Sequence, residues 1–365
     1  MRTVFLPIEI KAREFRTKVA VGATLARRGV NVVIGQYHAL EEQALANTSG
    51  GLFLHKGGPK ACDLERLYLD GRSVVILDEE LGPAIPFRSR RAALLNRFPI
   101  PESSHLSKAL FHDSDYAATA LSSVGLSEGQ VEVVGFPRLD LFSEEWRSCF
   151  ETQADRIRGR LGEFLLFSSD FPVSSDAAFR SRLNALSRGN AADAVLDRET
   201  LMYGAFQKVR ALLLELATDR RLPPIVVRPH PADFSGGWAY LCRATERMKC
   251  VYDGEYEAWI LASSGVLHQG CTGAVQALAA GVNHCRLAAG DDGADPSFVS
   301  QLSAPCASVD EVIEELGHSD CALREHSRAD WYRPGGSIVA VADCLEPLAS
   351  KVEGRFVPTL RNQLR

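Results

Sequence analysis

The sequence predicts an α/β protein made of two doubly wound parallel sheets. Its 365 residues are too many for one ordinary hydrophobic core, so two domains are expected. Short runs of Val, Ile and Leu alternate along both halves with amphipathic stretches of helical period. This alternation is the β-α-β rhythm of parallel sheets, in which helices cover both faces.

The first half opens with an expected strand at 3–10 (TVFLPIEI), followed by an amphipathic helix at 13–29 that Gly29 closes, and by a second strand at 30–35. Further strands are expected at 51–57, 73–80, 107–113 and 131–137. The order of these elements predicts one doubly wound domain.

The second half follows a polar, charged stretch at 143–162, inside which we place the domain boundary. A strand at 163–171 precedes a long helix at about 198–220, which leads into the strand 225–231. The remaining expected elements are 249–254, 256–263, 265–270, 273–281 and 283–287. This series predicts a second domain of the same kind.

Three segments result from these assignments. The first domain is expected at 1–150 and the second at 151–335. A carboxyl-terminal helix and tail, at 336–365, are expected to cross back onto the first domain. Strand ends from both domains are expected to line a central cleft, since ligands bind at the carboxyl ends of strands in open α/β sheets.

The composition is that of a soluble globular protein, with 46% hydrophobic and 24% charged residues. A net charge of −5 argues against a nucleic-acid partner, which would require a basic excess. The nine cysteines include no CxxC pair and no zinc-ligand spacing, so they are expected to be reduced thiols of a cytoplasmic protein. No run of 18 apolar residues occurs.

The tail at 351–365 is basic and carries Phe356, Val357 and Leu360. Such a segment suits peripheral contact with the anionic inner face of a membrane, and it equally suits a solvated terminus. Both interpretations stay open.

The stretch VVRPHPADF holds two functional side chains between prolines at the end of an expected strand. Pro229 and Pro231 lack an N–H and restrict the residues before them, so they stop the strand and stiffen the turn. Arg228, His230 and Pro231 are therefore predicted to face a ligand at the sheet edge. The alternatives are a simple strand stop and, for Arg228, an ion pair that fixes the turn.

The stretch HQGCTGAVQAL joins a strand to a helix. The free N–H groups of a first helical turn suit a phosphate, and Thr272 can add a hydroxyl. Gly270 and Gly273 would let a ligand approach the backbone closely. We therefore predict phosphate binding by Gly270, Cys271, Thr272 and Gly273, with an ordinary helix N-cap as the alternative.

Carboxylates follow two expected strands. Asp78, Glu79 and Glu80 come after VVIL, and Asp170 comes after LLFSS. Crowded carboxylates raise one another's pKa, which suits general acid or base work, so Glu79, Glu80 and Asp170 are the predicted catalytic residues. A solvated strand end is the alternative.

Charged residues at two other strand ends are predicted to bind substrate. Glu9 and Arg13, with Glu14, lie between the first strand and the first helix. Arg138 follows another strand in GFPRLDLF, where a pair with Asp140 that locks the turn is the structural alternative.

Several common sites are missing from the sequence. It contains no P-loop, no GxGxxG after the first strand and no GxSxG elbow, so ATPase, dinucleotide and α/β-hydrolase functions are not predicted. No DxD motif is present, and the stretch GDDGAD at 290–295 does not have EF-hand spacing. We predict neither a metal nor a cofactor.

In order and spacing, the stretches FLPIEIKAREF, LARRGVNVVIG, VVILDEELG, GFPRLDLF, RPHP and HQGCTGAVQAL resemble a family of bacterial surface carbohydrate biosynthesis proteins. That family looks related to GT-B glycosyltransferases with an HP motif that use CMP-activated acidic sugars, such as Kdo and sialic acid transferases. The resemblance implies a GT-B fold with an acceptor-side first domain and a nucleotide-sugar-binding second domain.

The resemblance also implies roles for residues. His230, Thr272 and Gly273 would hold the phosphate of a CMP-sugar, and the carboxylates of the first domain would face the acceptor and the donor sugar. Gln276 stands where such helices often carry a ribose-binding Glu, and Phe136 stands where Asn is expected.

The expected function is transfer of an acidic sugar from a CMP-sugar donor to a glycan or lipid-linked glycan acceptor, without a metal. A CMP leaving group carries one phosphate, whose charge a histidine and a helix terminus can stabilise. Retention and inversion stay open. The alternatives are a nucleotide-sugar 2-epimerase, a polyol-phosphate transferase and a non-catalytic nucleotide or glycan binder.

Overall fold

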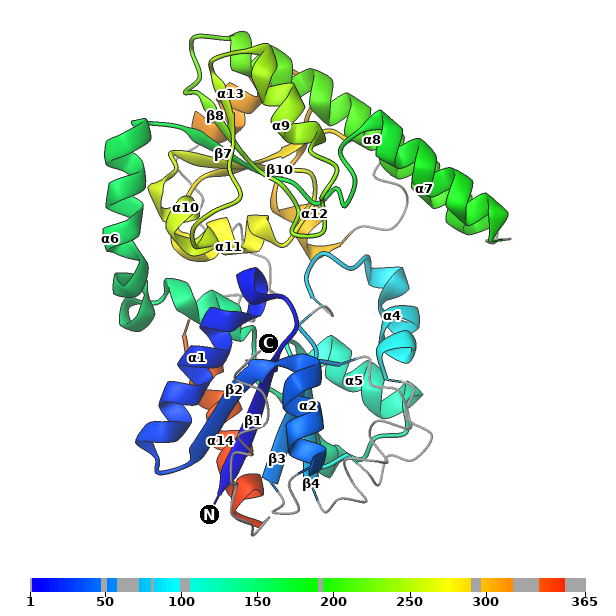
Figure 1. Ribbon diagram of the computed structural model, residues 1–365, viewed down its shortest axis with the longest axis vertical. Helices are drawn as coiled ribbons and strands as arrows, with labels where there is room; N and C mark the ends of the chain where they lie inside the picture. The colour runs from blue at the N-terminus through cyan, green and yellow to red at the C-terminus, as the bar shows by residue number, and fades with distance from the viewer. Residues whose placement is uncertain are drawn as a thin grey trace. The chain divides into compact units, whose positions relative to one another are not determined.

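The computed structural model describes residues 2–46, 51–57, 72–79, 82–98, 106–189, 193–289, 297–317 and 335–351 (Figure 1). Contacts divide the chain into two compact units. Unit 1 comprises Met1–Ser143 with Arg328–Arg365, and unit 2 comprises Glu144–Ser327. Each unit is described here by itself.

Unit 1 is a parallel sheet covered by helices. Its strands are β1 (Thr3–Ile8), β2 (Asn31–Gln36), β3 (Gly51–His55), β4 (Arg72–Leu77), β5 (Lys108–Phe111) and β6 (Val131–Val133). Its α-helices are α1 (Lys11–Arg27), α2 (Tyr37–Ala46), α4 (Arg90–Arg97), α5 (Ser114–Ser123) and α14 (Ser337–Lys351). Its 3-10 helices are η1 (Phe87–Ser89), η3 (Glu128–Gln130) and η4 (Pro137–Phe142).

The strand order of unit 1 is β2-β1-β3-β4-β5-β6, and all pairs are parallel. The strands are almost continuously apolar because helices cover both faces. On one face Phe5, Phe53 and Ile76 pack with Leu94 of α4 and Tyr116 of α5. Helix α14, red in Figure 1, packs beside α1 and contacts β3. Because β2 and β3 lie on opposite sides of β1, the sheet has its topological switch point between β1 and β3.

Unit 2 is a second parallel sheet. Its strands are β7 (Leu165–Ser168), β8 (Ile225–Arg228), β9 (Met248–Cys250), β10 (Gly265–His268), β11 (His284–Leu287) and β12 (Pro305–Cys306). Its helices are α6 (Glu144–Leu161), α7 (Asp176–Arg188), α8 (Asp193–Thr218), α9 (Gly237–Leu241), η5 (Cys242–Ala244), α10 (Tyr256–Ala262), α11 (Gly273–Ala280), α12 (Phe298–Leu302) and α13 (Val309–Gly317).

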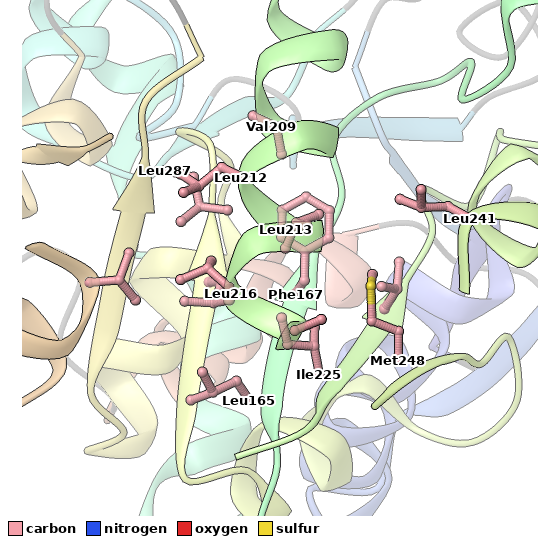
Figure 2. Packing of buried hydrophobic residues seen from close by; sticks show 14 of the residues in the cluster. Leu165, Phe167, Val209, Leu212, Leu213, Leu216, Ile225, Leu241, Met248 and Leu287 are labelled. Atoms are coloured by element: carbon pink, nitrogen blue, oxygen red, sulfur yellow. The ribbon is translucent and has the colours of Figure 1, made fainter. Parts of the chain in front are cut away.

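The strand order of unit 2 is β12-β11-β10-β7-β8-β9, with all pairs parallel. This is the Rossmann order, with its switch point between β7 and β10. The long helix α8 supplies one side of the core. Leu213 and Leu216 of α8 face Phe167 and Ile225 of the sheet, as Figure 2 shows.

The polar stretch at 143–162, in which we placed the domain boundary, is occupied by the helix α6, and unit 1 ends at Ser143. The helix α8 begins at Asp193, earlier than the expected start at 198. Helix α6 buries only Phe150, Ala154 and Ile157, because a narrow apolar stripe is enough to hold a helix whose other faces are solvated.

Candidate functional site

The loop after β8 fixes the tautomer of His230. The N–H of Ala232 donates to His230 Nδ1 at 3.1 Å, and the N–H of Asp233 donates to the His230 carbonyl at 2.8 Å. A ring nitrogen that accepts a hydrogen bond carries no proton, so the neutral imidazole has its proton on Nε2. The half-buried ring therefore presents a hydrogen-bond donor.

The rest of this loop is held by a short polar network. Asp233, which is buried, accepts hydrogen bonds from the Ser235 N–H at 3.0 Å and from its hydroxyl at 2.6 Å. The hydroxyls of Ser235 and Ser174 are 3.0 Å apart, and Ser174 Oγ accepts from the Trp238 N–H at 3.2 Å. The position of His230 is thus fixed by several bonds as well as by Pro229.

Arg228 is engaged within the protein. Its guanidinium donates to the carbonyl of Asp253 and, at 3.2 Å, to that of Gly254, and it lies 5.8 Å from the Trp259 ring centroid. Burial lowers the pKa of Arg228. These contacts fix the turn, as the structural alternative expected, although the partners are carbonyls instead of a carboxylate. Its phosphate contact stays a prediction.

The start of α11 lies against β7. The Tyr256 hydroxyl donates to Ser168 Oγ at 2.7 Å. A Cβ at Gly273 would lie 2.6 Å from Tyr256 Oη and 2.9 Å from Ser168 Oγ, so a larger residue cannot fit without displacement. The place that a Cβ at Gly273 would take is therefore filled by the protein's own hydroxyls, and phosphate binding by Gly273 stays a prediction.

Gly270 and Thr272 behave differently from Gly273. Gly270 has a φ of +111°, which favours glycine, and a Cβ there would meet no atom within 4 Å. Thr272 precedes the first residue of α11, but its side chain makes no cap hydrogen bond. The half-buried hydroxyl of Thr272 therefore stays available to a ligand, which the ordinary N-cap alternative did not anticipate.

The other predicted residues of this edge differ in exposure. Cys271 and Gln276 are buried, whereas Pro231 and Asp170 are exposed. Burial, and then the charge of Asp170, raises the pKa of the Cys271 thiol to about 12, so this thiol is neutral. Gln276 Oε1 is buried without a hydrogen-bond partner among the described residues.

A buried histidine pair next to this edge was missed by the sequence analysis. His268 ends β10 and accepts at Nδ1 from the Gly270 N–H at 3.1 Å. The His268 and His284 ring centroids are 5.5 Å apart. Burial lowers the pKa of both, for His284 to about 4. No sequence signal distinguished these histidines from ordinary strand residues.

In unit 1, Glu79 lies between two cations. Its Oε1 is 3.9 Å from Lys18 Nζ of α1, and its Oε2 is 4.0 Å from Arg138 Nη2 of η4. Glu79 is 8% exposed, Arg138 5% and Lys18 1%. The structure thus brings together the predicted residues Glu79 and Arg138, and it adds Lys18, which looked like a surface residue of an amphipathic helix.

Glu14 stands beside this group at the start of α1. Its carboxylate accepts from the Glu9 N–H at 2.8 Å and the Ile10 N–H at 3.3 Å, and Arg13 Nη2 is 3.7 Å away. Burial, and then the nearby charge of Glu79, raises the pKa of Glu14. The Glu9 carboxylate forms an ion pair with Lys56 next to the β1/β3 switch point.

Asp78 and His112 complete the carboxyl edge of the unit 1 sheet. Asp78 forms an ion pair with Arg97, and a Cβ at Gly57 would clash with the Asp78 carboxylate. His112 Nδ1 donates to the Gly135 carbonyl at 3.0 Å, so its Nε2 is unprotonated in the neutral ring. Burial lowers the pKa of His112.

Asp140 holds the carboxyl-terminal helix. Its two carboxylate oxygens accept from the Gly335 N–H at 2.6 Å and the Ile338 N–H at 2.7 Å, at the start of α14. A pair between Arg138 and Asp140 was the structural alternative expected from the sequence; in the structure the ion pair shown for Arg138 is with Glu79.

Some predictions lie outside the described residues, namely Glu80 and the basic tail after residue 351. Across the described ranges, no group of three or more His, Cys, Asp or Glu side chains has an arrangement that would hold a metal ion. In the same part of the chain, no helix is long and apolar enough to cross a bilayer.

Two doubly wound parallel-sheet units of this kind define the GT-B class of fold, which confirms the fold class predicted from the sequence. No protein-family model and no curated protein sequence matches the chain. Solved structures do match it over nearly its whole length.

Three of these structures illustrate the similarity. A co-structure of S. aureus MnaA with UDP has a TM-score of 0.57 at 12% identity, covering 96% of this chain and 97% of that one. UDP-GlcNAc 2-epimerase from Methanocaldococcus jannaschii has a TM-score of 0.55 at 8% identity, covering 94% and 98%. The wall teichoic acid polymerase TagF with CDPG has a TM-score of 0.54 at 11% identity, covering 96% and 88%.

Proposed function

We propose that this chain is a glycosyltransferase that moves an acidic sugar, Kdo or a related nonulosonic acid, from a CMP-sugar to a glycan or lipid-linked glycan acceptor in bacterial surface polysaccharide synthesis. The observation that carries the proposal is His230, an imidazole fixed as an Nε2 donor at the carboxyl end of β8. Two similar structures whose names mention UDP-GlcNAc or UDP, and a third that contains CDPG, support a nucleotide-linked substrate.

In this proposal unit 2 holds the nucleotide. The His230 Nε2–H and the Thr272 hydroxyl would donate to the single phosphate of CMP, and the positive end of α11 would add to them. Negative charge grows on this phosphate as the glycosidic bond breaks. Donors fixed before the reaction stabilise that charge without reorganisation.

Unit 1 supplies the acid–base chemistry in this proposal. Glu79 is the proposed general base, because it is a nearly buried carboxylate at the carboxyl edge of the sheet, beside Lys18 and Arg138. Arg138, Arg13 and Glu9 are the proposed substrate contacts. Asp170 of unit 2 and Glu80 stay secondary catalytic candidates.

A nucleotide-sugar 2-epimerase is the second candidate. Its support is specific, because several of the similar structures are epimerases by name, at TM-scores of 0.53 to 0.57. An epimerase also uses acid–base groups, so Glu79 and Glu14 suit that chemistry too. The two candidates differ in whether an acceptor is consumed.

A donor panel separates these functions. The purified protein is incubated with CMP-Kdo, CMP-N-acetylneuraminate, UDP-GlcNAc and CDP-glycerol, each with and without bacterial glycan acceptors. The proposal predicts acceptor-dependent release of CMP from one of the first two. Acceptor-independent conversion of UDP-GlcNAc to its 2-epimer would establish the epimerase instead, and consumption of CDP-glycerol alone would establish a polyol-phosphate transferase.

A further inference from the structure

Lys18 and Glu79 of unit 1 are buried together as an ion pair that is too long for a hydrogen bond. Lys18 Nζ and both carboxylate oxygens of Glu79 are buried and have no hydrogen-bond partner in the described ranges. The Lys18 Nζ–Glu79 Oε1 distance is 3.9 Å. Charge-assisted hydrogen bonds between such groups usually close to about 2.7–2.9 Å.

Three unsatisfied charged atoms in one buried place are costly. The charges of Lys18 and Glu79 form an ion pair, but nearly all buried polar groups in folded proteins also have a hydrogen-bond partner. The distance of 3.9 Å is too long for a direct bond but suits one small polar group bonded to both side chains. That group must accept from an ammonium and donate to a carboxylate. A hydroxyl does both.

The surroundings restrict the occupant further. Arg138 lies 4.0 Å from the second Glu79 oxygen, so Glu79 stays surrounded by positive charge. His112 Nε2, at the end of the neighbouring strand β5, is a buried acceptor without a partner among the described residues. The group lies at the carboxyl edge of the sheet, where α/β folds bind ligands.

We propose that Lys18 and Glu79 form a binding site for a sugar hydroxyl, which accepts from Lys18 Nζ and donates to Glu79 Oε1. The sugar as substrate rests on the proposed function. In glycosyl transfer the proton of this hydroxyl passes to Glu79 and its oxygen bonds to the anomeric carbon. The bond from that carbon to the phosphate oxygen breaks, and its electron pair leaves on CMP. Lys18 stabilises the developing alkoxide.

The test measures hydroxyl binding without any nucleotide. The ¹H–¹⁵N signal of the Lys18 ammonium, assigned by its loss in Lys18→Arg, is followed while methyl glycosides of glucose, galactose, mannose and N-acetylglucosamine are added. We expect a saturable shift with at least one glycoside. Glu79→Gln keeps the side-chain volume. It should weaken the affinity for the glycoside at least tenfold, as expected for losing a hydrogen bond to a charged group.

Two further variants keep the test interpretable. Lys18→Met/Glu79→Gln removes both buried charges, so it should fold and show no glycoside binding by calorimetry. Lys108→Met removes a half-buried lysine, 2.9 Å from Glu132, and should bind glycosides as the wild type does.

The outcomes separate this site from the proposed function. A Lys18 signal that no glycoside moves, or that moves equally in Glu79→Gln, overturns the hydroxyl site even if CMP-sugars are turned over. A saturable Lys18 response together with no turnover of any donor supports the hydroxyl site and removes the proposed function.

Discussion

His230 shows how far one side chain can be understood from sequence. The prolines on either side predict a stiff turn after a strand, and the structure has that turn. The tautomer was not predictable, because it depends on the N–H of Ala232, which only the folded loop brings to Nδ1. The functional state of a residue is thus set by contacts that its own motif does not encode.

Replacing His230 tests its role in turnover. His230→Ala should lower kcat by about 10²- to 10³-fold, the usual effect of losing one fixed donor to a developing charge. The measurement is the initial rate of CMP release with the active donor. His38→Ala is the matched control, since the His38 side chain is 77% exposed. Unchanged rates in a folded His230→Ala protein would make His230 a structural residue.

Lys18 was missed because a helix sequence does not show which polar side chain will be covered. Glu14 and Lys18 are four residues apart, as in an ordinary solvated ion pair. In the structure β4 and η4 supply Glu79 and Arg138 beside them, and Lys18 is buried. Only the tertiary contacts give this position its chemistry.

Among the elements, strands and their polar ends were easier to predict than helices. The apolar runs of β4, β8 and β10 are recognisable because parallel strands are buried on both faces. Helix α6 escaped notice because only Phe150, Ala154 and Ile157 of its 18 residues are buried. The rest of α6 is charged and resembles a linker.

The start of α11 can be tested by adding one methyl group. Gly273→Ala should displace Tyr256 or Ser168 and cost roughly 1–3 kcal/mol, the usual range for overpacking. Urea unfolding measures this cost. The double variant Tyr256→Phe/Gly273→Ala lacks the Tyr256 hydroxyl that the added methyl group would meet, so it should regain part of the lost stability.

Gly204→Ala is the matched control for that experiment. Gly204 lies in α8, and a methyl group added there would meet no atom within 4 Å, so alanine should stabilise the protein by about 0.5–1 kcal/mol. Equal effects of alanine at Gly204 and Gly273 would contradict the close packing at the start of α11.

The buried His284 of β11 should make the stability of the protein sensitive to acid. Burial lowers the pKa of His284 from 6.5 to about 4 in the folded state, so folding favours its neutral form. Below pH 6.5 the unfolded chain therefore binds a proton at His284 that the folded protein does not bind. The free energy of unfolding is greatest above pH 6.5 and decreases as pH falls toward about 4, by about 3 kcal/mol at most.

The measurement is urea unfolding between pH 7 and pH 4.5. His284→Leu should reduce the loss of stability in this range, since His284 Nδ1 has no hydrogen-bond partner in the described part of the chain. His38→Leu should leave the loss unchanged. If the free energy of unfolding depended on pH equally in His284→Leu and in the wild type, a neutral buried His284 would be contradicted.

At the scale of the whole chain, alternation of strands and helices was enough to predict two doubly wound units. The strand orders were not predictable, because every strand is a similar apolar run and pairing depends on long-range packing. These orders set the switch points, and therefore decide that Ser168 and Gly270 lie at one edge while Glu9 and Lys56 lie at another. The chemistry of both edges arises from topology as much as from motif.

The central claim is that unit 2 binds a nucleotide phosphate through His230. Calorimetric titration of CMP into the wild-type protein and into His230→Ala tests it most directly, with CDP and UDP for comparison. We predict that CMP binds the wild type, and that His230→Ala binds at least tenfold more weakly because a hydrogen bond to a charged group is lost. The claim would be contradicted if none of the three nucleotides bound the wild type, or if CMP bound both proteins with equal affinity.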